Sequence, residues 1–342
     1  MNRQAAFKFL TALTAAAVAL IAVEIVLRVS PTRSATRTEI GELPGTWNQN
    51  LPSFRGDPPK RRKRKNTFRV VVLGDSYTWG SGVYPDDAYP RRLERRLSAV
   101  FDTYRAEVIN WSRPGWNTSE QWRSFEPRLD VLDPDLVIVG FCLNDAEPTS
   151  RDERERFRAA RGLQSIADGP REHHGIARWS VLVQRSVDAL RNLRSRRILS
   201  NYYHDLYTDG DGWAEARETL AVMKQRLEAR DTRLLVVVHP VFDSQLDHRY
   251  RYRDIHETVV RGVTDAGVEV LDLLPHYEGI DARRLALVPF TDAHPSELAH
   301  RISADAILQH LLIENWLGFD TAAWKAGRLL RRQRKIQRNA AR

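Results

Sequence analysis

The stretch Phe68-Arg-Val-Val-Val-Leu-Gly-Asp-Ser-Tyr-Thr-Trp-Gly80 indicates the fold of this chain most clearly. A run of β-branched and apolar residues ends abruptly at Gly74-Asp75-Ser76. This pattern predicts a buried strand that delivers one serine to its carboxyl-terminal tip. A serine hydroxyl becomes a good nucleophile only when a base takes its proton, so a histidine and an orienting acid must come from elsewhere. Asp292-Ala293-His294-Pro295 supplies both.

Apolar segments alternate with helical patterns from residue 67 onward, and Thr118-Ser-Glu-Gln121 has the spacing of a capping box. We expect strands at Phe68–Leu73, Ala106–Asn110, Asp135–Phe141, Leu234–Val238 and Val268–Leu273, and helices at Tyr89–Val100, from Thr118 to about residue 130, at Trp213–Arg230 and from Ser296 to about Trp316. Such alternation favours a parallel sheet covered on both faces. The expected fold class is α/β, a three-layer sandwich with a central parallel sheet, preceded by one transmembrane helix.

Residues 9–29 form an apolar run that contains two threonines, Glu24 and Arg28. A helix of about 20 such residues spans a bilayer. A cleaved signal peptide is the alternative, and we favour an uncleaved anchor because the apolar run continues past its alanine-rich part. Glu24 lies four residues before Arg28 on the same helix face, so the pair can partly neutralise near the interface. A short N-terminal stub usually stays cytoplasmic, which would place the body in the periplasm or outside the cell; the reversed orientation is the alternative.

The expected organisation has five parts. They are a stub over residues 1–8, the anchor over 9–29, a linker over 30–66, a hydrolase-type domain over 67–318 and a basic tail over 319–342. Five prolines and the lack of sustained periodicity predict an extended, mobile linker. Residues 146–205 are rich in arginine and interrupt the alternation of strands and helices. We interpret them as an insertion over one edge of the site, with one helix from Trp179 to about Leu193.

Two basic runs dominate the charge of the chain. Residues 60–65 and 325–342 contain no acid. The summed positive charge of these two runs is larger than the net charge of the whole chain, +9, so the rest of the chain is mildly acidic. Such runs are usually solvated, and the functional alternatives are contact with anionic lipid headgroups or with an anionic polymer. No recognition motif accompanies them, so we expect no nucleic-acid partner. Cys142 is the only cysteine, which excludes an intramolecular disulfide and a cysteine-rich metal site.

Polar residues follow the expected strands at the edge where an open α/β sheet binds its ligand. Ser76 would attack an ester carbonyl, His294 would take its proton, and Asp292 would orient the imidazole. The backbone N–H groups of Ser76 and Gly115 and the side-chain amide of Asn144 would donate hydrogen bonds to the oxyanion. This chemistry needs no cofactor and no metal.

The set Gly74-Asp75-Ser76, Gly115, Asn144-Asp145 and Asp292-Ala293-His294-Pro295 resembles the SGNH hydrolases, also called GDSL-type esterases, over residues 67–316. The resemblance implies a flavodoxin-like sheet, with Ser76 as nucleophile, Gly115 and Asn144 as oxyanion donors, and Asp292 and His294 as the rest of the triad. Membrane-anchored members, in which Glu-x-x-Leu-Arg closes the anchor, are similar at residues 24–28. Related membrane-associated proteins often add or remove acetyl groups on cell-surface polysaccharides.

Three positions depart from the family pattern. Tyr77 replaces the usual leucine, a common change that we interpret as harmless. Cys142 stands where glycine is frequent and could narrow the oxyanion hole, although we expect it to be buried packing. Asp292 lies two residues before His294 instead of three, a spacing that resembles the alginate-acetylating branch. The Gly-x-Ser-x-Gly elbow of α/β-hydrolases is absent.

Several other polar residues are expected to have structural roles and no part in catalysis. Asp75 and Asp145 are expected to stabilise turns, and His239, His248 and His300 are expected to be surface or loop residues. The sequence thus predicts a serine esterase or acyltransferase whose substrate is a small acyl ester, with acetyl on a surface polysaccharide as the favoured case. The alternative from another class is a non-catalytic carbohydrate-binding or scaffold subunit with the same fold.

Overall fold

The computed structural model describes residues 3–29, 54–56, 62–101, 104–163, 179–289 and 292–317. The chain divides into two compact units. The smaller unit comprises Met1–Gly41 and Glu155–Tyr202, and the larger comprises Glu42–Arg154 and Tyr203–Arg342.

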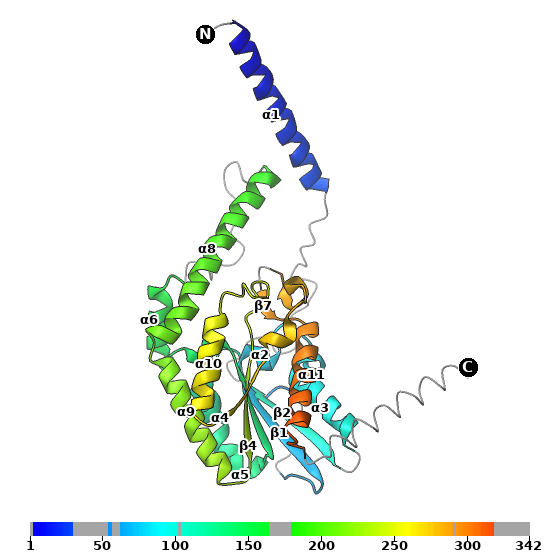
Figure 1. Cartoon of the computed structure of the whole chain (residues 1–342), viewed down its shortest axis with the longest axis vertical. Coiled ribbons are helices and arrows are strands. Elements are labelled where there is room, and N and C mark those ends of the chain that lie inside the picture. Colours follow the sequence, from blue (N-terminus) through cyan, green and yellow to red (C-terminus); the bar gives the residue numbers. More distant parts are fainter. Residues whose placement is uncertain are drawn as a thin grey trace, which may run out of the picture. The chain divides into compact units, whose positions relative to one another are not determined.

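A five-stranded parallel sheet in the order β2-β1-β3-β4-β5 forms the centre of the larger unit (Figure 1). Its strands are β1 (Thr67–Gly74), β2 (Arg105–Ser112), β3 (Leu136–Phe141), β4 (Arg233–Val238) and β5 (Glu269–Asp272). After β2 the chain returns to the other side of β1 to form β3, so the strand order reverses at β1. Ligands of open α/β sheets bind outside the carboxyl ends of the strands at such a switch point.

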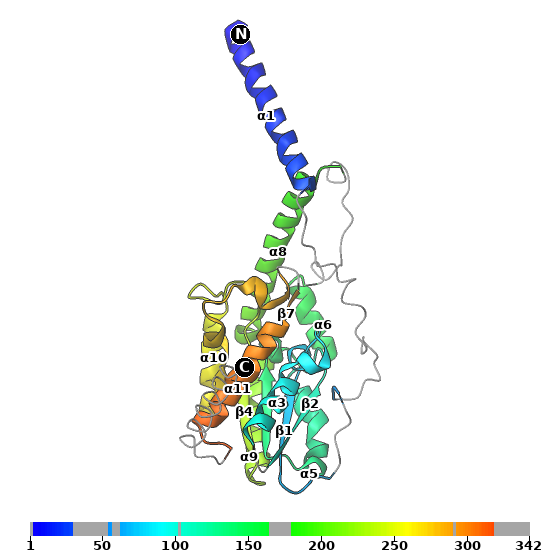
Figure 2. The same cartoon turned by 90° about the vertical axis from the view of Figure 1, so that its right-hand side faces the viewer.

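Helices cover both faces of this sheet (Figure 1). Helices α3 (Tyr89–Val100) and α11 (Glu297–Ile313) pack on each other over one face, and α4 (Thr118–Phe125), α9 (Gly212–Glu228) and α10 (Arg253–Asp265) cover the other. Two short helices, α2 (Ser76–Trp79) and α5 (Leu129–Leu132), lie in the connections. In the view of Figure 2, α3 and α11 lie in front of the sheet. The predicted three-layer α/β fold is therefore confirmed.

The core of the larger unit follows the hydrophobic periodicity of the sequence. Leu93, Leu97 and Val100 form the buried stripe of α3, and the interior residues of β1 and β3 are almost fully buried. A strand covered on both faces needs a continuous apolar run, and β1 and β3 both have one. Each predicted strand overlaps an observed strand, with ends that differ by at most two residues.

The N-cap of helix α4 is Asn117, one residue before the predicted N-cap, Thr118. The side chain of Asn117 accepts a hydrogen bond from the backbone N–H of Glu120 at 2.9 Å, and the Glu120 carboxylate accepts one from the Asn117 N–H at 3.0 Å. The predicted box at Thr118 and Gln121 is wrong because Asn117 is the last extended residue and Thr118 is already helical. Pro127 lies in the 3₁₀ segment Glu126–Arg128, which separates α4 from α5 where one helix was predicted.

Several elements were not predicted. They are α10, the helix α6 (Arg151–Ala160), and the two-stranded antiparallel sheet of β6 (Ala286–Val288) and β7 (Asp292–Pro295). Helix α8 (Val181–Thr208) is longer than the helix predicted from Trp179 to about Leu193. The placement of residues 146–205 over an edge of the site stays a prediction.

Part of the predicted linker is ordered against the sheet. The backbone of Arg55 pairs with that of Asn110 in β2, and its guanidinium donates to the carbonyls of Gly80 at 2.5 Å and Val83 at 2.7 Å. Lys63 forms an ion pair with Asp135 at 2.6 Å. The prediction of an extended, mobile segment is therefore wrong at these residues. The basic tail over 319–342 lies outside the described residues.

The N-terminal helix α1 (Arg3–Val29) contains the predicted apolar run. Within the described residues one segment, Phe7–Val29, is long and apolar enough to cross a membrane. A signal sequence near the N-terminus meets the same criteria of length and composition.

Candidate active site

Ser76 is the first residue of α2, directly after the carboxyl end of β1. Asp75 caps this short helix, since its Oδ1 accepts a hydrogen bond from the Tyr77 N–H at 2.8 Å. A Cβ atom on Gly74 would lie 1.9 Å from Thr78 Oγ1, so only glycine allows the helix to turn back so closely onto the strand. The Gly-Asp-Ser sequence thus builds a tight strand-to-helix turn with the serine at its outer corner.

A chain of hydrogen bonds joins Ser76, His294 and Asp292. His294 Nε2 lies 2.9 Å from Ser76 Oγ, and His294 Nδ1 lies 2.6 Å from Asp292 Oδ1. Asp292 Oδ1 also accepts the backbone N–H of His294 at 3.0 Å. Both residues belong to β7, where positions i and i+2 point to the same face. The short Asp-x-His spacing therefore suffices to place the carboxylate beside the imidazole.

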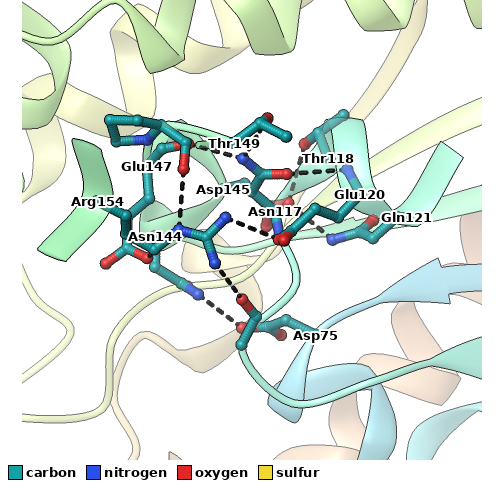
Figure 3. Close-up of polar contacts among 12 residues, drawn as sticks. Asp75, Asn117, Thr118, Glu120, Gln121, Asn144, Asp145, Glu147, Thr149 and Arg154 are labelled. Carbon is teal, nitrogen blue, oxygen red and sulfur yellow. Dashed lines mark hydrogen bonds and ion pairs between the residues drawn. The ribbon is translucent and has the colours of Figure 1, made fainter. Parts of the chain in front are cut away.

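Asn144 lies in the 3₁₀ segment Leu143–Ala146 that follows β3. Its Nδ2 donates a hydrogen bond to Asp75 Oδ2 at 3.0 Å (Figure 3). A primary amide has two N–H donors. The second N–H of Asn144 has no hydrogen-bond partner among the described residues.

Gly115 occupies a turn after β2. The backbone N–H of Trp116 bonds to the carbonyl of Arg113 at 3.2 Å, and Gly115 has φ +82°. Proline second and a positive-φ glycine third are the signature of a type II turn, and Pro114-Gly115 provides it. The structure places this turn at the same edge as Ser76, because Ser112 pairs with Gly74 at the ends of β2 and β1.

Arg154 connects the turn at Gly115 with the segment after Asn144 (Figure 3). Its guanidinium donates to the Gly115 carbonyl at 3.1 Å and to the Pro148 carbonyl at 2.9 Å. It also binds Glu120 Oε2 at 2.8 Å and lies 3.7 Å from Glu147 Oε2, with its side chain only 12% exposed. Sequence reasoning missed this residue because an arginine in an arginine-rich segment gives no local signal.

Tyr77 holds the strand that carries the histidine. Its hydroxyl donates to the Ala293 carbonyl at 3.0 Å, and its ring lies 5.5 Å from the His294 ring and stacks on Phe242. Ala293 lies between the two residues of the hydrogen-bonded chain. A leucine has no hydroxyl to form this contact. The interpretation of Tyr77 as a harmless replacement stays a prediction.

Buried acids lie beneath the turn. Asp145 accepts hydrogen bonds from Thr118 Oγ1 at 2.9 Å, Gln121 Nε2 at 2.8 Å and the Cys142 N–H at 2.7 Å, which confirms its turn-stabilising role. Burial raises the pKa of the carboxyl groups of Asp75 and Asp145 and that of the Cys142 thiol. A protonated, buried thiol is a poor nucleophile, so Cys142 is packing, as predicted.

His239 and His300 are both buried. The prediction as surface or loop residues is wrong for His300, which lies in α11, whereas His239 lies in the loop after β4. His239 follows β4 and packs against the rings of Tyr77 and Tyr89, and neither of its ring nitrogens has a hydrogen-bond partner among the described residues. Burial lowers the pKa of His239 to about 3 and that of His300 well below its usual range. Both imidazoles are therefore neutral in the folded protein. His248 is exposed, as predicted.

Acid is expected to destabilise the fold through these two histidines. An unfolded histidine titrates near pH 6.5, so at lower pH the unfolded chain binds protons that the folded chain excludes, and the free energy of unfolding falls with pH. Replacing His239 by phenylalanine should reduce this dependence by up to about 1.4 kcal/mol per pH unit between about pH 6 and pH 4. Urea unfolding of both proteins across this range measures the two slopes. Equal slopes would show that His239 is not buried in its neutral form.

No group of three or more histidine, cysteine, aspartate or glutamate side chains arranged to hold a metal ion occurs in the described part of the chain. The polar groups around Ser76 instead form a serine–imidazole–carboxylate chain with nearby N–H donors. That arrangement, at the carboxyl edge of a parallel sheet, is typical of serine-dependent acyl hydrolases. The chain belongs to the GDSL-like lipase/acylhydrolase family, whose model matches residues 72–302. The predicted family is thereby confirmed.

Solved structures of low sequence identity resemble the chain. TesA has 15% identity and a TM-score of 0.42 over 71% of this chain and 97% of its own. A mutant of Axe2, an acetyl-xylooligosaccharide esterase from Geobacillus Stearmophilus, has 14% identity and a TM-score of 0.45 over 77% and 98%. The acetyl xylan esterase AlAXEase has 13% identity and a TM-score of 0.42 over 71% and 99%. No curated protein matches the chain.

Proposed function

We propose that this protein cleaves oxygen esters through an acyl-enzyme formed on Ser76. The observation that carries the proposal is the continuous hydrogen-bonded chain from Ser76 Oγ to His294 Nε2 and from His294 Nδ1 to Asp292. In this arrangement a base lies within reach of the nucleophile's proton, and the acid fixes the tautomer of the base. Membership of an acylhydrolase family supports the same chemistry.

Two half-reactions follow from this geometry. Ser76 Oγ attacks the carbonyl carbon while its proton passes to His294 Nε2; His294 then protonates the leaving alcohol as the ester C–O bond breaks. A second nucleophile, water or a sugar hydroxyl, attacks the acyl-enzyme and gives its proton to His294, which returns it to Ser76. The oxyanion of each tetrahedral intermediate accepts hydrogen bonds from the Ser76 and Gly115 N–H groups and the Asn144 amide. Each such donor is worth about 10²–10³ in rate.

The substrate we propose is an acetyl ester on a cell-surface carbohydrate. The proposal rests on the sequence resemblance at residues 24–28 and on an apolar helix long enough to anchor the protein in a membrane. The anchor over 9–29 would hold the domain over 67–318 outside the cytoplasm, joined by the segment 30–66. The final acceptor of the acetyl group decides between hydrolysis and transfer.

Product analysis with an acetylated oligosaccharide tests this proposal. Hydrolysis predicts release of acetate, and transfer predicts acetylation of an added unacetylated sugar; both must disappear in Ser76→Ala. Binding of the oligosaccharide without either product would contradict the esterase proposal and favour a binding subunit. If the protein cleaves other acyl esters but not acetyl esters, the proposed esterase activity stands and acetyl is excluded as the acyl group of its substrate.

Removing the Tyr77 hydroxyl is expected to slow catalysis more than it destabilises the protein. In Tyr77→Phe the ring still packs on Phe242, but the bond to the Ala293 carbonyl is lost, which costs about 0.5–1.5 kcal/mol of stability. We expect kcat to fall about 5–20-fold with KM nearly unchanged, since a less ordered imidazole reacts from fewer conformations. Tyr277→Phe, which loses a buried bond to the Ala299 carbonyl away from the site, is the matched control. Equal kcat values for the two variants would show that the Tyr77 hydroxyl does not position the imidazole of His294.

Arg154→Met should lower kcat about 10–100-fold and leave KM within about threefold, because a loosened Gly115 turn weakens one oxyanion donor. The methionine retains most of the apolar volume of the arginine. Steady-state kinetics on a soluble acetate ester, with circular dichroism as a check on folding, measures the split. Arg226→Met is the control, since Arg226 pairs with Glu126 at 3.2 Å and is 63% exposed. A folded Arg154→Met enzyme with full kcat would contradict the prediction.

A further inference from the structure

The carboxylate of Glu24 caps the start of a helix that lies far from it in the sequence. Its Oε1 accepts the backbone N–H of Val181 at 2.8 Å, and its Oε2 accepts the N–H of Leu182 at 3.0 Å and the Ser180 hydroxyl at 2.9 Å. Val181 is the first residue of α8. The first N–H groups of a helix have no partner within the helix, and they favour a negative charge. An acid of α1 therefore satisfies donors that α8 cannot satisfy itself.

Two arginines extend this contact. Arg28 donates to Glu24 Oε1 at 2.8 Å and to the carbonyl of Trp179, the second residue before α8. Arg185 in the first turns of α8 donates to the Leu27 carbonyl near the end of α1 at 3.5 Å. Each helix thus supplies partners for the unpaired backbone groups of the other. All of these residues belong to the smaller unit, and both views show the end of α1 beside the start of α8 (Figures 1 and 2).

The position of Glu24 in the apolar helix makes this contact informative. A charged side chain within a membrane span costs free energy, and it usually pairs with a second group that offsets this cost. Arg28 donates one hydrogen bond to the Glu24 carboxylate, whereas Ser180 and the first two residues of α8 donate three. Glu24 lies five residues before Val29, the end of α1, which corresponds to about 7.5 Å along a helix. If α1 spans a bilayer, the carboxylate of Glu24 lies at the level of the interfacial region. The start of α8, which binds this carboxylate, must then lie at the same level.

The residue next to this contact suits the same location. Trp179 is 74% exposed although it is one of the largest apolar side chains. Tryptophan is enriched at the boundary between lipid and water, where its ring is buried and its N–H is hydrated. Its exposure in the protein is therefore compatible with contact with lipid headgroups.

We propose that Glu24 and Arg28 latch the start of α8 to the anchor, and that Trp179 lies among the headgroups of the bilayer that α1 spans. The latch gives the anchor a structural role in the folded protein, since removal of α1 would leave the first N–H groups of α8 without their cap. The inference goes beyond the proposed esterase chemistry and rests only on its membrane-anchor part.

A fluorescent label at position 179 tests the lipid contact in the full-length protein. Trp179→Cys is labelled with an environment-sensitive dye after reconstitution into phosphatidylcholine–phosphatidylglycerol vesicles; the 2% exposed Cys142 does not compete. We expect blue-shifted emission that lipids with a nitroxide near the headgroup quench. In the Glu24→Leu background quenching should fall at least about twofold, because leucine removes the cap yet favours membrane insertion of α1. Asp188→Leu, which removes an acid of α8 paired with Arg191, should leave quenching unchanged.

Amide exchange tests the latch separately. Hydrogen exchange at Val181 and Leu182 should accelerate about five- to tenfold in Glu24→Leu and less in Glu24→Gln, which retains an acceptor oxygen. Unchanged exchange in Glu24→Leu would overturn the latch. Protein that floats with the vesicles but carries an unquenched label at 179 would overturn the lipid contact. Protein that fails to float would overturn the lipid contact together with the proposed anchor, whereas esterase activity, measured in the same samples, reports on the proposed chemistry alone.

Discussion

Replacing Ser76 by alanine is expected to lower kcat for ester hydrolysis by about 10⁴–10⁶-fold, with KM nearly unchanged. The substitution removes only the attacking oxygen, so the N–H donors and the surrounding turn stay in place. Ser76 Oγ contacts His294 and, at 3.4 Å, Asp75 Oδ2, and neither contact holds the fold together. Steady-state kinetics on a soluble acetate ester measures the effect, and the midpoint of thermal unfolding should shift by no more than a few degrees.

The neighbouring Ser81→Ala variant is a matched control for this substitution. It removes a hydroxyl from the turn that follows α2 and should retain wild-type kinetics. If Ser76→Ala kept even a tenth of the wild-type kcat, the acyl-enzyme account would be wrong and a binding or scaffold role would become the better explanation.

Replacing His294 by alanine should have an effect of similar size, because serine without its base is a weak nucleophile. The informative variant is the double mutant. Groups that act as one unit are strongly non-additive, so Ser76→Ala combined with His294→Ala should be no slower than either single variant. Kinetics of the three variants under the same conditions provide this comparison, with His248→Ala, which alters an exposed histidine, as the control.

Additive losses would contradict the shared role of the two residues. Two independent losses of this size would indicate that Ser76 and His294 act in separate steps or that His294→Ala disrupts β7. Circular dichroism and the thermal midpoint of His294→Ala separate these possibilities.

The fold could be predicted from the sequence because its strands are long apolar runs. The runs at β1 and β3 are buried on both faces and end at polar residues, so both the sheet and its functional edge were visible. Ser76 and His294 could be paired in advance because acyl transfer requires a base for the serine. The structure adds the 2.9 Å contact between them, which no sequence pattern specifies.

The site residues that sequence reasoning missed act through tertiary contacts. Tyr77 contacts a carbonyl 216 positions along the chain, and Arg154 contacts one that is 39 positions away. Neither contact has a local periodicity or motif. The burial of His239 could not be predicted for a related reason: a polar residue in the loop directly after a strand is usually exposed, whereas here aromatic rings cover it.

The spacing of two residues between Asp292 and His294 departs from the usual family pattern. In the structure both lie in β7, a strand that was not predicted, and the extended backbone brings positions i and i+2 to one face. A three-residue strand such as β6 has too few residues for a pattern of alternating burial. The hairpin could therefore not be predicted, although it explains how the acid reaches the histidine.

Labelling with a fluorophosphonate tests the central claim most directly. The full-length protein, wild type beside Ser76→Ala, is treated with the probe and the modified residue is located by mass spectrometry. An activated serine predicts modification of Ser76 alone and no modification in the alanine variant, whatever the natural substrate. A folded wild-type protein that takes up no probe, or one labelled equally in the Ser76→Ala variant, would contradict a nucleophilic Ser76.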